Sequence, residues 1–207
     1  MKIPACGKSK GTTPTIGNHG EIPGSVFLWK SHYPRQYERK MFTHDGTLVS
    51  IRPIKPIDDS LLIEFFKSLS AETVFFRFLR YLKTLPAEWV EHFTQIDFDR
   101  DVAMVAATGS GEREQIQGVC RIMRKPGATK GEIAVVVGDI WQRKGIGSVL
   151  LEHCIQIARE IGITSLWALV SVDNSVALAL AEKFGFSQKV SPDLETAELE
   201  KILQSDQ

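Results

Sequence analysis

The sequence lacks an excess of either charge. Its 207 residues include 25 basic and 25 acidic side chains, so the formal net charge is zero. A protein that binds nucleic acid usually carries a strong basic excess, because contacts to phosphates supply much of its affinity. We therefore expect no nucleic-acid partner.

Long hydrophobic runs are also missing. The longest candidates, Ile133–Val137 and Ser165–Val172, are far shorter than the ~18 apolar residues of a membrane-spanning helix. The segment from Met1 to Gly7 contains no hydrophobic stretch of the kind found in signal peptides. The sequence predicts a cytoplasmic protein without a membrane partner.

Cysteine is scarce, and its spacing excludes two kinds of site. Cys6, Cys120 and Cys154 form no CxxC pair and no even-numbered framework, which favours a reducing compartment. We interpret Cys120 and Cys154 as small buried hydrophobes rather than nucleophiles. His153 stands apart from the other four histidines, so no metal-ligand spacing is present and no metal is expected.

The first part of the chain differs in composition from the rest. Residues 1–25 are rich in Gly, Pro, Ser and Thr and show no hydrophobic periodicity. Residues 1–40 carry seven Lys or Arg against Glu21 and Glu38, a local excess of 7 − 2 = +5. We predict an N-terminal arm over residues 1–40, poorly structured or packed on the domain, and one domain over residues 41–207.

Hydrophobic periodicity within 41–207 predicts an α+β fold, with a mixed sheet and helices on both faces. Helical spacing of apolar residues is found at 59–69, 70–78, 86–96, 148–161 and 174–183. Alternating or continuous apolar runs predict strands at 41–44, 47–51, 102–108, 115–123, 131–137 and 165–170, with further strand content in 187–203. Asp45-Gly46 is typical of a two-residue hairpin turn.

The segment Val135–Ser148 carries the chemistry. A buried strand runs into a turn with two glycines, and the turn opens a helix. Gly145 and Gly147 allow a ligand to approach the backbone closely, and the first N–H groups of the helix form an anion site. Arg143 and Lys144 add positive charge at the rim. This pattern indicates a phosphate site, although Leu150 stands where a dinucleotide fingerprint needs its third glycine.

The segment Gln142–Gly147 resembles the Q/R-x-x-G-x-G/A pyrophosphate loop of the GNAT acyltransferases. The other matching features follow in the expected order, and the resemblance covers about residues 47–187. They are the helix 148–161, the strand Ser165–Val170, Asn174 with Ala177, and the pair Gly185-Phe186. Arg52-Pro53-Ile54 and Thr73-x-x-x-Arg77-Phe78 are similar to the catalytic domain of bacterial Pat-type protein lysine acetyltransferases.

This resemblance implies the GNAT acyl-CoA N-acyltransferase fold, with a splayed mixed sheet, and acetyl-CoA as co-substrate. The pantetheine arm of the donor would run along Val135 and Val137 and contact Asn174. The same main chain would polarise the thioester carbonyl. Its pyrophosphate would bind the backbone N–H groups of Arg143, Lys144, Gly145, Ile146, Gly147 and Ser148.

Glu132 is the predicted general base, since it occupies the position of the catalytic glutamate in the Pat-type pattern. A lysine ammonium, with a pKa of ~10.4, becomes a nucleophile only after losing a proton. Many GNAT enzymes place a tyrosine that protonates the leaving thiolate where this chain has Ala181. We expect water to protonate the thiolate, with Ser171 or Ser175 as alternatives.

The sequence therefore predicts an N-acetyltransferase that moves an acetyl group from acetyl-CoA to an amine by direct attack. The favoured acceptor is a protein lysine, for example on an acyl-CoA synthetase. Two alternatives remain open: a small-molecule amine as acceptor, and a non-catalytic acyl-CoA-binding regulatory module. The oligomeric state, including a homodimer, is left open.

Overall fold

A computed structural model describes residues 33–192 and 194–203, and within them one mixed sheet of eight strands has the order β1-β2-β3-β4-β5-β6-β8-β7. The strands are β1 (Arg39–Phe42), β2 (Leu48–Pro53), β3 (Val102–Thr108), β4 (Gln115–Arg124), β5 (Lys130–Val137), β6 (Ser165–Ser171), β7 (Ser187–Val190) and β8 (Thr196–Ile202). The helices are α1 (Asp59–Lys67), α2 (Ala71–Phe78), α3 (Ala87–Thr94), α4 (Ile146–Glu160) and α5 (Ser175–Lys183). The predicted α+β class is confirmed.

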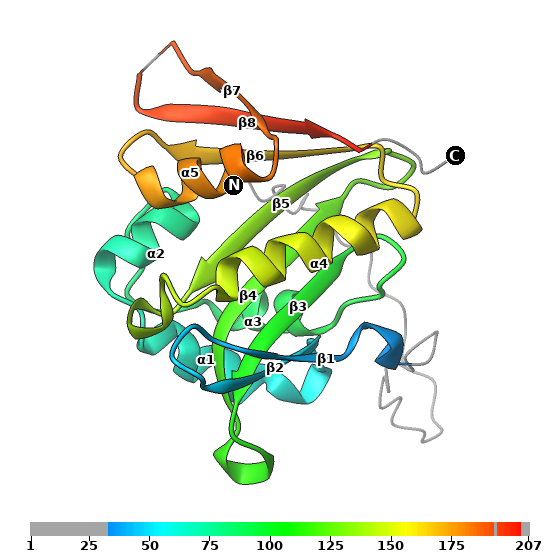
Figure 1. Ribbon diagram of the computed structural model, residues 1–207, viewed down its shortest axis with the longest axis vertical. Helices are drawn as coiled ribbons and strands as arrows, with labels where there is room; N and C mark the ends of the chain where they lie inside the picture. The colour runs from blue at the N-terminus through cyan, green and yellow to red at the C-terminus, as the bar shows by residue number, and fades with distance from the viewer. Residues whose placement is uncertain (1–32, 193, 204–207) are drawn as a thin grey trace, which may run out of the picture.

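The alternation of β4 shows how the sheet separates two helical layers. A Cβ built on Gly118 would lie 3.2 Å from side-chain carbons of Ile146 and Leu150, so this face of β4 packs on α4. Val119 and Arg121, which point the other way, line a small cavity together with side chains of α1, α2 and α3. Figure 1 shows α4 crossing in front of β3, β4 and β5.

The sheet separates between β5 and β6. The two strands are parallel and pair only at Lys130–Glu132 with Ser165–Trp167, although β5 continues to Val137 and β6 to Ser171. On its other side β5 stays paired with β4 as far as Val137. The gap therefore opens after Glu132, on the β6 side of β5 alone.

The β1–β2 hairpin is correctly predicted as an element, but its turn is not the two-residue type. Thr43 N donates to Thr47 O (2.9 Å) and Gly46 N donates to Thr43 O (2.9 Å), which closes a three-residue loop. Gly46 has a φ of 82°, as the last loop residue of such a turn requires. The Asp-Gly pair therefore occupies the second and third loop positions, and His44 occupies the first.

Other differences from the expected boundaries are small. Ser70 caps a separate helix, its Oγ accepting from Thr73 N (3.2 Å), and Pro86 precedes α3 instead of being its first residue. Strand β1 begins at Arg39, inside the segment expected to be an arm. Residues 1–32, the greater part of that arm, lie outside the described residues. None of the described helices is long and apolar enough to cross a membrane.

Candidate active site

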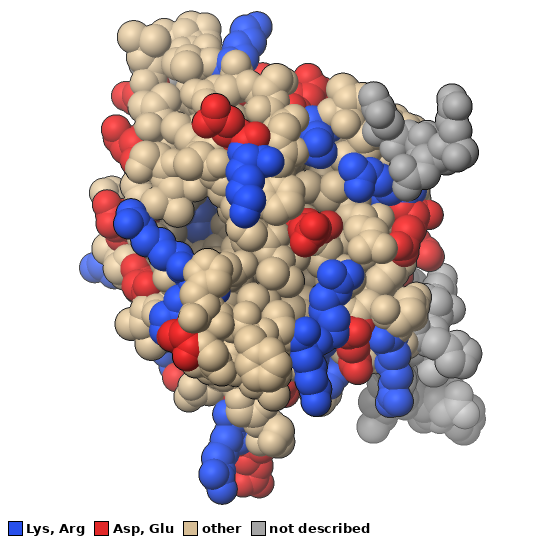
Figure 2. All heavy atoms as spheres, in the orientation of Figure 1, with Lys and Arg blue, Asp and Glu red and all other residues tan. Residues whose placement is uncertain are grey.

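A groove of about 630 Å³ lies beside the open end of β5. Its walls come from the carboxyl end of β5, the β5–α4 loop, the outer face of α2 and the first turns of α4 and α5. In the space-filling view the molecule is hollowed between α2 and α5, with Lys or Arg atoms at the floor (Figure 2). Among the residues predicted for the donor, the groove is lined by Val135, Val137, Arg143, Gly145, Gly147, Ser148 and Asn174.

The main chain of β5 faces this groove at two predicted positions. Gly138 N donates to Gln117 O across the β4 side (2.8 Å). Since successive residues of a strand direct their backbone groups to opposite sides, Val135 and Val137 direct theirs toward the β6 side. There the ladder has already ended, so an extended ligand can pair with them as an additional strand would.

The loop that follows β5 has the backbone shape of an anion site. Arg143 has a φ of 59° and Gly145 a φ of 93°, which curves the chain just before α4 begins at Ile146. In any helix the N–H groups of the first turn have no acceptor within the helix, and here they meet the positive end of the helix dipole. The loop therefore fits a diphosphate bound through main-chain donors.

Two side chains of the predicted loop turn away from the groove. Lys144 Nζ pairs with Asp45 Oδ2 at 2.7 Å and lies 4.8 Å from the centre of the Trp141 ring. Ile146 is fully buried in the core. The expected cationic rim is therefore corrected to Arg143 alone, because the Lys144 ammonium has a closer carboxylate partner. Both residues can still contribute backbone N–H groups.

The loop of the β1–β2 hairpin contacts the loop that precedes α4, here called the phosphate loop (residues 138–145). The sequence did not reveal this contact. His44 N donates to Lys144 O (3.4 Å), and a Cβ built on Gly145 would lie 3.2 Å from His44 Nε2. A hydrogen bond from the Lys144 ammonium, together with hydrogen bonds from Thr43 and Thr47, holds the pKa of the Asp45 carboxyl far below its usual range. The partners are about a hundred positions apart, and no local pattern connects them.

A second contact fixes α2 over the groove. Asp139 accepts hydrogen bonds from Ser70 N (2.9 Å), Ser70 Oγ (2.6 Å) and Thr73 Oγ1 (2.8 Å). Burial alone would raise the pKa of Asp139, but these hydrogen bonds lower it below its usual range. Gln142 Nε2 donates to Val137 O (3.2 Å), which joins the same loop to the end of β5. The loop, β5 and α2 thus form one rigid wall.

Asn174 lies at the start of α5, where its Oδ1 accepts from Ala177 N (3.0 Å). The side chain is a helix cap, and its Oδ1 is engaged in this role. Only the Nδ2 group can donate to a ligand in the groove. The predicted contact is therefore compatible with the structure if Asn174 acts as a donor.

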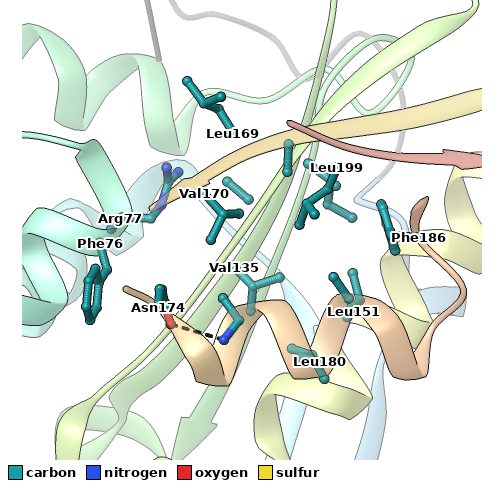
Figure 3. A pocket seen from close by; sticks show the side chains of 15 residues that line it. Phe76, Arg77, Val135, Leu151, Leu169, Val170, Asn174, Leu180, Phe186 and Leu199 are labelled. Carbon is teal, nitrogen blue, oxygen red and sulfur yellow. Dashed lines mark hydrogen bonds between the residues drawn. The ribbon is translucent and has the colours of Figure 1, made fainter. Parts of the chain in front are cut away.

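The groove continues into a cavity of about 100 Å³ between β5 and β6. Figure 3 shows Phe76 and Arg77 entering it from α2 at one end, with Leu151 and Phe186 at the other. Ala181, at the position where many GNAT enzymes place a tyrosine, lines this cavity as well. Arg77 also lines the groove and the small aromatic cavity behind β5, and so stands where the three spaces meet.

Glu132 is the last β5 residue paired with β6, and its side chain is half-buried. It lies opposite Met123 of β4 and on the same face as Val136, the face that α2 covers. Burial lowers the pKa of Arg77, and the charge of Glu132 partly offsets that effect, so the two side chains interact across β5 and α2. Glu132 does not line the groove itself.

Several other sequence features have structural roles. Arg52 is buried and pairs with Asp58 (2.6 Å) and Glu114 (2.9 Å), away from the groove. Ser171 is buried and its Oγ accepts from Asp173 N (3.3 Å). Among the described residues no group of His, Cys, Asp and Glu side chains could hold a metal ion.

The family model of the GNAT acetyltransferases matches residues 65–186. The GNAT domain of S. lividans PAT has 30% sequence identity and a TM-score of 0.77, and the likeness covers 83% of this chain and all of that one. An acetyltransferase of Pseudomonas aeruginosa is 29% identical over 76% of this chain and 85% of its own length. Acetyltransferase Pat of Mycolicibacterium smegmatis is 28% identical, but the match covers 68% of this chain and only 41% of that protein.

Proposed function

The chain belongs to the GNAT acetyltransferase family, and we propose that it transfers the acetyl group of acetyl-CoA to a lysine side chain of a protein in the cytoplasm. The observation that carries the proposal is the open edge of β5 beside the first turn of α4. The open edge of β5 would supply main-chain partners for the pantetheine arm, and the first turn of α4 would supply N–H donors for the diphosphate. The distance between them is fixed by the loop of residues 138–145.

The donor supplies an activated thioester carbon that an amine nitrogen can attack. Backbone groups of Val135 and Val137 would hold its arm, and Asn174 Nδ2 would donate to the same arm. The N–H groups of residues 143–148 and the Arg143 guanidinium would hold the diphosphate. Because the ladder to β4 holds the β5 main chain in place as far as Val137, its N–H groups would face the oxyanion without reorganisation.

Glu132 is proposed as the general base, directly or through a water molecule. The attacking nitrogen forms the amide bond, its proton passes to Glu132, and the C–S bond breaks with the electron pair leaving on sulfur. The carboxylate lies three residues before Val135 on the strand that presents the thioester. Of the cysteines that the structure describes, Cys120 and Cys154 are both fully buried, which favours direct attack over a covalent acyl-enzyme on either thiol.

A protein lysine is the favoured acceptor because Thr73, Arg77 and Phe78, which resemble the Pat-type pattern, lie on α2. Thr73 and Arg77 line the groove itself. The likeness to the S. lividans PAT domain supports the same class. A small-molecule amine would use the same donor site and chemistry.

The test has two steps. The purified chain should release free thiol when it is incubated with acetyl-CoA and candidate amines. A regulatory module would bind acetyl-CoA but release no free thiol. Candidate proteins, including an acyl-CoA synthetase, are then incubated with the chain and acetyl-CoA and examined by mass spectrometry. Acetyl-lysine at defined positions supports the proposal, and acetylation restricted to polyamines or other small amines contradicts the protein acceptor.

A further inference from the structure

The cavity between β5 and β6 contains one charged side chain. Of the described side chains that line it, only Arg77 and Asn174 are polar, and Asn174 Oδ1 already caps α5. The remaining lining is aliphatic or aromatic: Phe76, Ile133, Ala134, Val135, Leu151, Ala168, Leu169, Val170, Ala177, Leu180, Ala181, Phe186 and Leu199. A charge in such surroundings interacts more strongly than the same charge in water.

The proposed reaction places a negative charge in this cavity. When the C–S bond breaks, the electron pair remains on the sulfur of CoA as a thiolate, although a thiol of ordinary pKa near 8.5 is largely protonated at neutral pH. An apolar cavity would disfavour the thiolate and so slow the departure of the leaving group. The site therefore needs either a proton donor or a fixed positive charge.

No described hydroxyl lines this cavity; Thr73, Ser148 and Ser175 line only the adjoining groove. Ala181 contributes no donor, and Ser171 does not line the cavity. Tyr33, Tyr37 and Tyr81 do not line it either. A positive charge from α2 is then the available way to stabilise the thiolate.

We propose that Arg77 stabilises the departing CoA thiolate by a charge-assisted hydrogen bond, so that the sulfur leaves as an anion and takes its proton from water afterwards. The inference rests on the proposed function, because it needs the thioester between β5 and β6. Guanidinium does not deprotonate in proteins, so Arg77 acts as an electrostatic catalyst and not as a general acid.

The charges around Arg77 permit this role. Glu132 of β5 attracts it, Arg121 of β4 lies near enough to repel it, and Cys120 adds a further electrostatic interaction. The guanidinium carbon is 5.0 Å from the centre of the Phe78 ring. Arg121 cannot replace it, because Arg121 does not line the cavity between β5 and β6; its Nη1 donates to Phe93 O (2.6 Å) and its Nη2 to His92 O (3.4 Å) at the end of α3.

A binding measurement separates this role from a general effect on activity. The thiol of CoA is titrated in complex with the protein by the ultraviolet absorbance of the thiolate. The absorbance of the complex with desulfo-CoA is subtracted, which removes the contribution of the protein's own tyrosines and cysteines. The wild-type complex should lower the thiol pKa by about one unit or more relative to free CoA, as an adjacent positive charge does.

Four variants sharpen the test. Arg77→Met should raise the pKa of the bound thiol to that of free CoA or above it, because the cavity is otherwise apolar, and Arg77→Lys should keep part of the downward shift. Arg80→Met is the matched control, since Arg80 lies on the exposed side just after α2, 4.6 Å from the Trp89 ring, and should titrate as wild type. Glu132→Gln should not raise the thiol pKa, which distinguishes contact with sulfur from an effect passed through Glu132.

Turnover provides the second measurement. Arg77→Met should lower kcat ~100-fold, the usual size for one electrostatic contact in the transition state. An equal thiol pKa in wild type and Arg77→Met overturns the inference and leaves the proposed function intact. Absence of CoA binding to the wild type would contradict the proposed donor site and the inference together.

Discussion

At the scale of single residues, Glu132 allows a direct test of the chemistry. Glu132→Gln keeps the size of the side chain and removes its basicity, so kcat should fall ~10²–10⁴-fold, the range for loss of a general base. The affinity for CoA should hardly change, because Glu132 does not line the groove. Steady-state kinetics and calorimetry measure the two quantities. Glu64→Gln, on an exposed side chain of α1, serves as control, and wild-type turnover in Glu132→Gln would remove the residue from this role.

Gly145 tests the shape of the phosphate loop. Its φ of 93° is unfavourable for any other residue, and a Cβ would lie 3.2 Å from His44 Nε2. Gly145→Ala should therefore weaken CoA binding at least tenfold in calorimetry, a change of ~1.4 kcal/mol. Gly127→Ala provides the matched control, since Gly127 has a φ of 74° with nothing within 4 Å of its Cβ. That variant should lose stability through backbone strain and keep its CoA affinity.

At the scale of elements, α4 is held by His153. This side chain is 2% exposed; its Nε2 donates to Tyr37 O (2.7 Å), and its Nδ1 contacts the Arg39 guanidinium. Burial lowers its pKa below 6.5; the hydrogen bond to Tyr37 O opposes this effect, Arg39 lowers the pKa further, and Glu160 and Glu152 raise it by less. The neutral imidazole is thus the form that joins the first strand of the sheet to α4.

A pH dependence of stability follows. As the pH falls below ~6.5, the unfolded chain binds a proton at His153 and the folded protein does not, so the free energy of unfolding decreases until the pH passes the folded-state pKa. Urea denaturation between pH 7.5 and 5 should show this loss, and His153→Gln should show a flatter profile. His92→Gln, at an exposed position of α3, should keep the wild-type slope. An unchanged slope in His153→Gln would assign the acid sensitivity elsewhere.

The elements also show where sequence reasoning succeeds and where it ends. The bounds of β3 were predicted because a continuous apolar run lies between Asp101 and Gly109, both strong local signals. The Asp45-Gly46 turn was mistaken because the same dipeptide also suits a three-residue loop. Lys144 was expected at the groove because it lies in the loop before α4, and no local pattern shows that its ammonium pairs with the distant Asp45. Only the folded hairpin brings that carboxylate to 2.7 Å.

The lining of the groove was predicted in part for the same reason. Val135, Val137, Gly145 and Gly147 lie within one local motif, so their joint position at the groove could be read from the sequence. Arg77 belonged to a segment that the sequence singled out, but its place between three cavities depends on how α2 packs across β5. That packing is non-local and becomes visible only in the structure.

At the scale of the whole molecule, ligand binding should stabilise the fold. CoA at a hundredfold excess over its dissociation constant should add ~2.7 kcal/mol to the free energy of unfolding, provided that the unfolded chain does not bind it. Thermal unfolding at increasing CoA concentration measures the effect. The Gly145→Ala variant should need proportionally more CoA for the same rise in Tm. A melting curve indifferent to CoA would contradict the proposed donor site.

The three residue pairs that join β5 to β6 also define a pivot. Any tilt of strands β6, β8 and β7 against β1–β5 that kept these pairs would turn about Lys130–Glu132 and would change the spacing most at the Val137 end. The width of the cavity between β5 and β6 would then be set by the geometry of the sheet as well as by single side chains. Changes far from the cavity that alter this tilt, in α4 or in β8, would then alter which acyl chains can enter.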